Sequence, residues 1–181
     1  MESSMSNVKQ TKNILYRIEK DFPIKGVNFV DLTPTLTDGE AFKTVSTELK
    51  NKVLEYNDDI DYIISPDARG FLWGTYVAAL LEKPLVPIRK HGKLPPGSVM
   101  ATINDTTEYS NIELDIPIVD LKNKKCIFID DVYATGGTYK ACKKLVEMHG
   151  GIMENAYVVL DIKLTNDNII SLIENNNLEI E

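Results

Sequence analysis

Residues 126–138 restrict the fold of this chain more than any other stretch. They begin with four consecutive apolar residues, Cys126-Ile127-Phe128-Ile129, with no polar residue among them. Such a strand meets water on neither face, which is typical of a central parallel strand covered by helices on both sides. A segment of helical period follows and ends at Gly150-Gly151, and a second buried run starts at Tyr157. These features predict a strand–loop–helix–strand unit with a right-handed crossover, and therefore an α/β fold.

The loop between that strand and that helix has the composition of a phosphate site. It reads Ala134-Thr135-Gly136-Gly137-Thr138. Its backbone N–H groups and the positive end of the following helix would converge on one point, and the glycines would let a phosphate approach the backbone closely. Asp130 and Asp131 precede it at the carboxyl end of the strand, where open α/β sheets bind ligands. Two adjacent carboxylates resist ionisation unless polar or cationic groups answer them, as ribose hydroxyls and Mg²⁺ would. A helix cap followed by a solvated turn is the alternative explanation.

The composition excludes several classes of protein. With 181 residues, 43% hydrophobic and 26% charged, the chain is predicted to form one soluble globular domain. The net charge of −7 disfavours a nucleic-acid partner. No apolar run approaches the ~20 residues that span a bilayer, so no membrane partner is expected. Cys126 and Cys142 fall at apolar positions, which indicates reduced cysteines in a cytoplasmic protein.

The rest of the chain continues the alternation of strands and helices. Residues 7–21 are predicted to form a helix with one apolar face, which comprises Val8, Ile14, Leu15 and Ile18. A second helix is expected to begin at the capping residue Asp38 and to reach about Glu55. Further predicted elements are strands at 62–64 and 85–88, a hairpin at 100–104 and 112–116, a short helix at 167–173 and a terminal strand at 178–180.

Positive charges follow two of the expected strands. The strand at 62–64 leads into Ser65-Pro66-Asp67-Ala68-Arg69-Gly70-Phe71, so Arg69 offers a planar guanidinium for phosphate oxygens at the same edge as the acidic pair. The strand at 85–88 leads into Arg89, Lys90 and Lys93. Such a cluster is most often a solvated surface. Beside a diphosphate site it would instead neutralise a leaving group of high negative charge.

These motifs resemble those of a known enzyme family. The run at 126–138, an apolar strand followed by Asp-Asp, two residues and Ala-Thr-Gly-Gly-Thr, resembles the phosphoribosyl-pyrophosphate signature of the type I phosphoribosyltransferases. Asp67–Phe71 resembles the pyrophosphate loop of that family, in which a cis peptide bond is common. Three segments resemble the adenine-specific branch: Phe22–Asp31, Ile88–Pro95, and Glu108-Tyr109 with Glu113–Ile116. The resemblance covers the chain from Phe22 to its end.

The resemblance implies a doubly wound α/β fold with a mainly parallel, five-stranded sheet flanked by helices. It implies a single domain over residues 1–181, with a small N-terminal hood at roughly 1–38 and a core at roughly 39–181. A flexible β-hairpin loop would carry Glu108. A basic side chain from the Arg89–Lys93 region would reach the site of a neighbouring subunit, so a homodimer is expected.

The implied reaction joins adenine to 5-phosphoribosyl 1-pyrophosphate, which yields AMP and pyrophosphate. The implied cofactor is Mg²⁺, held mainly through the substrate and near Asp130 and Asp131. The implied catalytic residues are Glu108, which would manage the proton of the purine, and the same two aspartates. The implied binding residues are Asp130, Asp131, Ala134, Thr135, Gly136, Gly137 and Thr138 for the 5-phosphate and ribose; Asp67, Ala68, Arg69, Gly70, Arg89, Lys90 and Lys93 for the pyrophosphate; and Val27, Asn28, Phe29 and Val30 for the base.

One departure from the family pattern bears on the choice of base. Val30 stands where the adenine-specific branch usually has an arginine, so one hydrogen-bond donor is missing from the expected base pocket. Two alternatives remain open at this point. One is a phosphoribosyltransferase for hypoxanthine, guanine or xanthine, and the other is a non-catalytic sensor of phosphoribosyl pyrophosphate.

Overall fold

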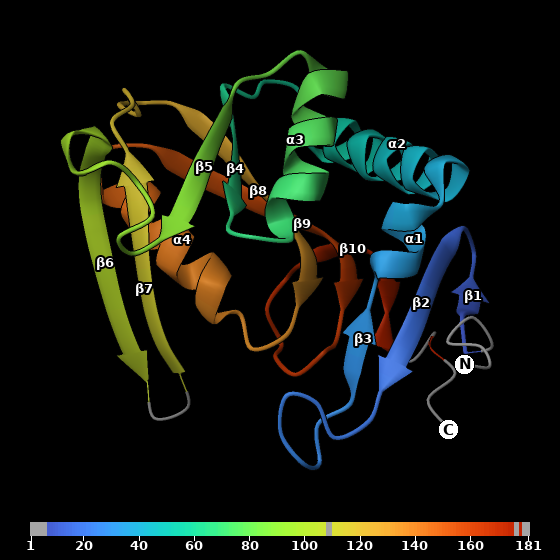
Figure 1. Ribbon diagram of the computed structural model, residues 1–181. Coiled ribbons are helices and arrows are strands. Elements are labelled where there is room, and N and C mark those ends of the chain that lie inside the picture. The colour runs from blue at the N-terminus through green and yellow to red at the C-terminus, as the bar shows by residue number, and fades with distance from the viewer. Residues whose placement is uncertain (1–6, 108–109, 176–177, 179–181) are drawn as a thin grey trace.

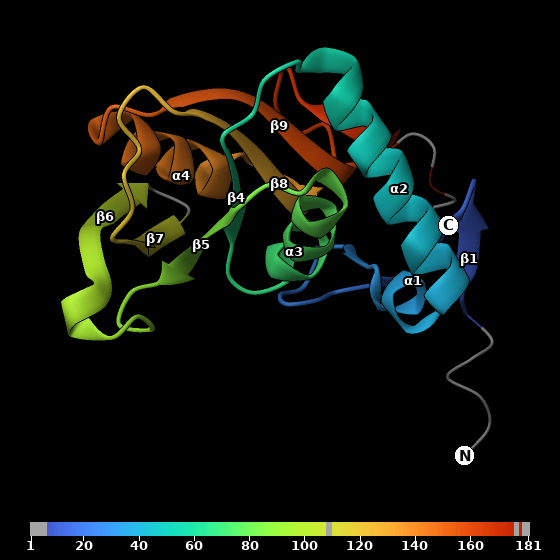
Figure 2. The same cartoon turned by 90° about the horizontal axis from the view of Figure 1, so that it is seen from above.

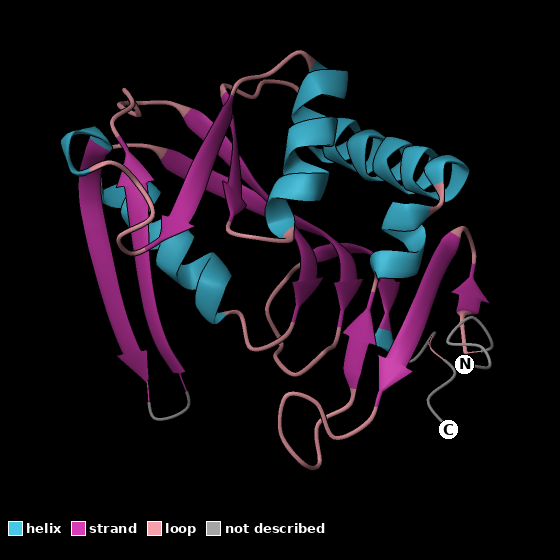
Figure 3. Cartoon of the chain, viewed as in Figure 1, coloured by secondary structure: helices cyan, strands magenta, loops and turns pink. Residues whose placement is uncertain are grey.

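The computed structural model describes residues 7–107, 110–175 and 178, and the side chains of these residues except 105–107, 110 and 111. A seven-stranded sheet runs through the molecule in the order β10-β9-β8-β4-β5-β7-β6 (Figure 1). Its strands are β4 (Tyr62–Pro66), β5 (Leu85–Lys90), β6 (Val99–Thr107), β7 (Ser110–Pro117), β8 (Lys125–Tyr133), β9 (Ile152–Asp161) and β10 (Ile170–Glu174). One helix connects β4 to β5 and another connects β8 to β9, and both of these strand pairs are parallel (Figure 3).

Five neighbouring strands of this sheet, β10, β9, β8, β4 and β5, are parallel to one another. Strand β7 then pairs antiparallel with β5, and β6 pairs antiparallel with β7. The predicted five-stranded parallel sheet is therefore confirmed, and the predicted hairpin extends it at one edge. Residues 108–109, which separate β6 from β7 in the sequence, lie outside the described residues.

The central strand β8 is buried on both faces, as its apolar run predicted. Ile127 and Ile129 contribute to the core that helices α2 (Gly39–Tyr56) and α3 (Gly70–Leu81) cover. Cys126 and Phe128 point to the opposite face and pack in the core beneath α4 (Gly137–Met148). Figure 2 shows α2 and α3 on one side of the sheet and α4 on the other. This arrangement is the layered, doubly wound fold that the sequence predicted.

The helix predicted to begin at Asp38 is also present. The carboxylate of Asp38 accepts hydrogen bonds from the N–H groups of Glu40 and Ala41 at 3.1 and 2.9 Å, which caps α2. A short helix, α1 (Thr33–Thr37), precedes it, and a 3-10 turn (Pro96–Ser98) precedes β6. Among residues 7–107, 110–175 and 178, no helix combines the length and hydropathy that a bilayer span requires.

The prediction of a helix at residues 7–21 is wrong. This segment forms β1 (Lys9–Thr11) and β2 (Ile14–Glu19), which join β3 (Phe29–Asp31) in a separate three-stranded sheet. Ile14 and Tyr16 are fully buried while Leu15 and Arg17 are partly exposed, so the segment has the two-residue period of a strand. The hydroxyl of Thr35 accepts the N–H of Leu15 at 2.8 Å and donates to its carbonyl at 2.6 Å, which fixes α1 against β2.

The predicted helix at 167–173 is also wrong, because residues 170–174 form strand β10. Ile170 pairs with Tyr157 of β9, and the parallel ladder continues to Glu174. Leu172 and Ile173 are buried in the same core as α2. Most of the predicted terminal strand at 178–180 lies outside the described residues.

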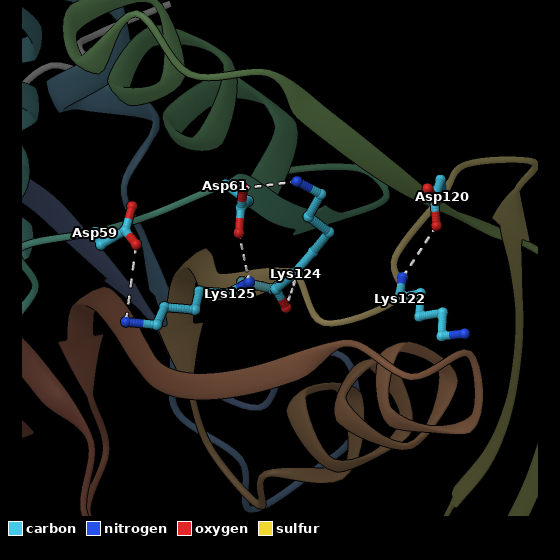
Figure 4. Close-up of polar contacts among 7 residues, drawn as sticks. Asp59, Asp61, Asp120, Lys122, Lys124 and Lys125 are labelled. Atoms are coloured by element: carbon cyan, nitrogen blue, oxygen red, sulfur yellow. Dashed lines mark hydrogen bonds and ion pairs between the residues drawn. The ribbon is translucent and has the colours of Figure 1, made fainter.

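Salt bridges and backbone hydrogen bonds fasten the amino ends of β4 and β8, at the edge of the sheet opposite the acidic pair (Figure 4). Asp61 accepts the N–H of Lys125 at 2.8 Å and pairs with the ammonium of Lys124 at 3.1 Å. Asp59 lies 3.9 Å from the ammonium of Lys125. These contacts align the two central strands far from the carboxyl edge, where the ligand site is expected.

Candidate active site

A cavity of about 730 Å³ opens at the carboxyl ends of β4 and β8. The residues that line it come from the N-terminal sheet, the loop after β4, the end of β5, the loop after β8 and the segment after β9. Of the residues proposed from sequence, it brings together Val27, Asn28, Phe29, Val30, Asp67, Ala68, Arg69, Lys90, Asp130, Asp131, Ala134, Thr135, Gly136, Gly137 and Thr138. Gly70, Arg89 and Lys93 do not line it.

The acidic pair lies at the floor of this cavity. Asp131 is 4% exposed, and its Oδ2 lies 2.8 Å from Nε of Arg69. Asp130 is less covered, and its Oδ1 accepts the N–H of Asp131 at 2.8 Å. Burial, and then the negative charge of Asp131, raise the pKa of Asp130 well above its ordinary value, while Arg69 opposes the rise. Asp130 is therefore a carboxyl whose ionisation depends on the cations and hydroxyl groups that face it.

The phosphate loop, residues 134–138, turns sharply before α4. Gly136 has φ +78°, a backbone conformation that glycine adopts without strain. Helix α4 then begins at Gly137 without a side-chain cap. The amides of its first turn consequently remain available to an anionic ligand at the positive end of the helix.

Arg69 connects the acidic pair to the N-terminal sheet. Its guanidinium carbon lies 4.9 Å from the ring centroid of Phe29, over the ring, and Phe22 packs edge-on against the same ring at 5.2 Å. Val30, next along β3, is 4% exposed and belongs to the apolar core. Position 30 therefore supplies packing and no hydrogen-bond donor to the cavity.

The loop after β4 has the backbone geometry that the resemblance implied, since a cis peptide bond joins Asp67 and Ala68. Nε of Arg89 lies 2.9 Å from Oδ2 of Asp67, and the two side chains form a salt bridge. Gly70 packs against the acidic pair, because a Cβ at this position would lie 2.8 Å from Oδ1 of Asp130. Arg89 and Gly70 thus support cavity residues from behind.

A second buried carboxylate holds the loop that follows β5. Asp115 of β7 is 1% exposed and accepts hydrogen bonds from the N–H of Gly92 at 2.9 Å and the hydroxyl of Thr102 at 2.7 Å. Nδ1 of His91 lies 2.8 Å from its Oδ1. Burial alone would raise the pKa of Asp115, but the hydrogen bonds from His91, Thr102 and Gly92 lower it. The Asp115 carboxylate therefore anchors residues 89–93, the basic loop, to the hairpin.

Sequence reasoning missed part of the cavity wall. Ile162 and Leu164 follow β9 and line the cavity, and Tyr133 and Tyr139 line it on either side of the phosphate loop. The available signal was the buried run at 157–160, since the residue after a central parallel strand lies at the same edge as the acidic pair. Glu108, the predicted proton carrier, lies outside the described residues. Within the described ranges, no group of three or more His, Cys, Asp or Glu side chains is arranged to hold a metal.

Known proteins share both the sequence and the fold of this chain. The family model of the phosphoribosyl transferase domain matches residues 34–166. The chain is 40% identical over 166 residues to an adenine phosphoribosyltransferase of Mesomycoplasma hyopneumoniae (strain 7448), which covers 87% of this chain and 94% of the relative. It is 44% identical over 161 residues to that of Thermosipho africanus (strain TCF52B), covering 84% and 92%.

Two solved structures have the same fold. The adenine phosphoribosyltransferase of Thermoanaerobacter pseudethanolicus aligns with a TM-score of 0.79 and 36% identity, covering 88% of this chain and 95% of that one. The Saccharomyces cerevisiae enzyme, complexed with an imino-altritol bisphosphate and adenine, aligns with a TM-score of 0.78 and 27% identity, covering 87% and 92%. The fold and the cavity define a nucleotide-forming transferase of the α/β class. The chain belongs to the phosphoribosyl transferase domain family.

Proposed function

We propose that this chain transfers the 5-phosphoribosyl group of phosphoribosyl pyrophosphate to adenine, forming AMP and pyrophosphate. The observation that carries the proposal is one cavity in which an acidic pair, an uncapped helix N-terminus and residues 27–30 of the N-terminal sheet region meet. The names of the relatives at 40% and 44% identity support adenine as the base.

The phosphate loop and the acidic pair bind the sugar in this proposal. Amides of residues 135–138 hold the 5-phosphate at the positive end of α4. Asp130 and Asp131 accept hydrogen bonds from the ribose hydroxyls. As the bond to pyrophosphate breaks, positive charge develops on the anomeric carbon, and the field of the two carboxylates stabilises it.

Two cations that line the cavity, Arg69 and Lys90, stabilise the departing pyrophosphate. Mg²⁺ commonly binds one or two carboxylates together with substrate phosphates, so the Asp130–Asp131 pair fits an ion that arrives with the substrate. When bound, that ion neutralises charge on the leaving group. Nε of Arg69 lies 2.8 Å from Oδ2 of Asp131, so the arginine is held beside the acidic pair.

The base binds against the N-terminal sheet. The ring of Phe29 and the side chain of Val27 supply an apolar surface for a purine ring, and Asn28 supplies a side-chain amide beside them. Because Val30 is buried in the core, the exocyclic groups of the base must be recognised by Asn28 or by backbone atoms.

Two expectations from the sequence enter the proposal unchanged. Glu108, which lies between β6 and β7 in the sequence, exchanges the proton of the purine as its nitrogen attacks. The chain acts as a homodimer in which the basic loop of one subunit reaches the cavity of the other. Glu108→Ala should then lower kcat much more than it raises KM. Chemical cross-linking of the wild type should recover a dimer.

Incubation with Mg²⁺, phosphoribosyl pyrophosphate and one purine at a time tests the proposal. AMP formation with adenine, and no nucleotide with hypoxanthine, guanine or xanthine, is the expected result. Nucleotide from another purine alone would overturn the choice of base. Binding of phosphoribosyl pyrophosphate without product from any purine would indicate a non-catalytic sensor.

A further inference from the structure

Tyr133, Asp167 and Lys140 form a polar cluster behind the phosphate loop. Tyr133 is the last residue of β8 and is 3% exposed. Its hydroxyl donates a hydrogen bond of 2.6 Å to Oδ2 of Asp167, in the segment between β9 and β10. The ammonium of Lys140, on the first turns of α4, lies 3.1 Å from the same oxygen. The Tyr133–Asp167–Lys140 cluster thus joins the end of β8 and the start of α4 to the segment after β9, which is distant in sequence.

The cluster lies in contact with the apex of the phosphate loop. A Cβ at Gly136 would collide with the hydroxyl oxygen of Tyr133, would lie 2.8 Å from Cζ of its ring, and would approach Oδ2 of Asp167 to 3.2 Å. The backbone of Gly136 therefore rests directly on the tyrosine–carboxylate pair. The loop also carries the amides proposed to hold the 5-phosphate. Because its backbone rests on Tyr133 and Asp167, the positions of these two side chains determine where those amides lie.

The same cluster fastens the opposite wall of the cavity. The N–H of Ile162 donates to the carbonyl of Tyr133 at 2.9 Å. The N–H of Asp167 donates to the hydroxyl of Thr165 at 3.4 Å. Ile162 and Leu164, which lies between these attachment points, line the cavity. One tyrosine is consequently bonded to the segment after β9 through both its backbone and its side chain.

The charges in the cluster favour a structural role for Asp167 in supporting the phosphate loop over a role in binding a ligand. The hydrogen bond from Tyr133, followed by that from Lys140, lowers the pKa of Asp167, so its carboxylate is ionised at neutral pH. An unpaired carboxylate at this distance from the loop would repel a phosphate. Here the Tyr133 hydroxyl and the Lys140 ammonium occupy Oδ2, which offsets that repulsion.

We propose that Tyr133 and Asp167 are positioning residues that set the geometry of the phosphate loop and couple it to the segment after β9. This inference rests on the proposed function, in which the loop binds the 5-phosphate. It assigns to Tyr133 a contribution to affinity at one end of the substrate only. The pyrophosphate end, at Arg69 and Lys90, has no contact with the cluster in the described residues.

Equilibrium titration with three probes tests the proposal: phosphoribosyl pyrophosphate, ribose 5-phosphate and pyrophosphate. Tyr133→Phe removes one hydrogen bond and keeps the ring, so it should weaken the first two ligands by the same factor, about three- to tenfold. Pyrophosphate binding should not change, and kcat should stay within about twofold of wild type while KM for phosphoribosyl pyrophosphate rises. Asp167→Ala should match Tyr133→Phe, Asp167→Asn should restore part of the loss, and the double variant should be no worse than either single variant.

Tyr157→Phe is the matched control. Tyr157 is fully buried in β9, and its hydroxyl accepts a hydrogen bond from Asn57, away from the cavity lining. This control should lower the free energy of unfolding without changing the affinity for ribose 5-phosphate. Equal ribose 5-phosphate affinity in wild type and Tyr133→Phe would overturn the inference alone. Failure of the wild type to bind either phosphoribosyl ligand would instead overturn the proposed function.

Discussion

Nε of Arg69 lies 2.8 Å from Oδ2 of Asp131, so the loop after β4 and the end of β8 are joined across the cavity floor. The guanidinium also covers the ring of Phe29, which brings the N-terminal sheet to the same point. One arginine therefore contacts the structural parts proposed to bind the ribose and the base, while its remaining N–H groups are available for the pyrophosphate. This position explains why a single side chain is expected to affect both substrates.

Replacement of Arg69 should impair catalysis strongly. Arg69→Met removes a charge-assisted contact to the leaving group, and it should lower kcat/KM for phosphoribosyl pyrophosphate about 10- to 100-fold. Arg69→Lys should recover only part of this loss, because an ammonium does not reproduce the planar fork. Steady-state kinetics measures both effects. Lys52→Gln, which breaks an exposed ion pair on α2, is the control and should behave as wild type; an Arg69→Met enzyme as active as that control would remove arginine from the mechanism.

The raised pKa of Asp130 predicts a dependence of stability on pH. A carboxyl whose pKa is raised by folding stabilises the folded state below its unfolded value of 3.8, and this stability is lost as the pH rises through the folded pKa. Asp130→Asn cannot ionise. The Tm of the variant relative to wild type should therefore increase as the pH is raised above 3.8, in the absence of substrate. A difference that is constant over this range would show that Asp130 is not destabilised by its surroundings.

His91 should titrate above its ordinary pKa of 6.5, because the hydrogen bond and the charge of Asp115 favour the imidazolium. The stability that this pair contributes is complete below pH 6.5 and is lost as the pH rises through the folded pKa of His91. NMR titration of the imidazole measures that pKa directly. In Asp115→Asn it should return toward 6.5. An unchanged titration would mean that the Asp115 carboxylate does not hold the basic loop through His91.

The contacts of Asp61 at the opposite edge of the sheet should matter for folding alone. Asp61→Asn weakens the bonds to the N–H of Lys125 and the ammonium of Lys124, so the urea midpoint should fall modestly. Its pKa is lowered by the N–H of Lys125 and then by Lys124, so this contribution fades as the pH falls through the folded pKa. Kinetic constants should stay within about twofold of wild type. A loss of activity without a loss of stability would indicate that this edge communicates with the cavity.

Four of the five parallel strands, β4, β5, β8 and β9, could be predicted from sequence because each contains a short apolar run. The run at 126–129 is buried on both faces in the structure, as its composition requires. The motifs at the ends of β4 and β8 could be placed at one edge for the same reason, since carboxyl ends of parallel strands share an edge.

Local patterns failed where two periods coincide. In β2, Ile14 and Ile18 are four residues apart, as on a helix, while Ile14, Tyr16 and Ile18 also alternate, as on a strand. Pairing of Ile18 with Val30 of β3 decides between the two, and that pairing is a contact between distant residues. The same holds for β10, which is selected by its ladder with β9.

Contacts between distant side chains were equally out of reach. Tyr133 meets Asp167 across 34 positions, and Arg89 meets Asp67 across 22. Nothing in the spacing of these residues indicates that one carboxylate supports a glycine loop and the other pairs with a strand-end arginine. The sequence predicted which residues reach the carboxyl edge of the sheet, and the fold determines which of them touch.

The most direct test of the account is AMP formation by the variant Asp130→Ala with Asp131→Ala, supplied with adenine, Mg²⁺ and phosphoribosyl pyrophosphate. Circular dichroism and the thermal transition first establish that the variant is folded. The account predicts product at the level of the enzyme-free reaction, because the ribosyl cation-like transition state loses both of its carboxylates. AMP formation at the wild-type rate by the folded variant would contradict the claim that this acidic pair acts on the phosphorylated sugar.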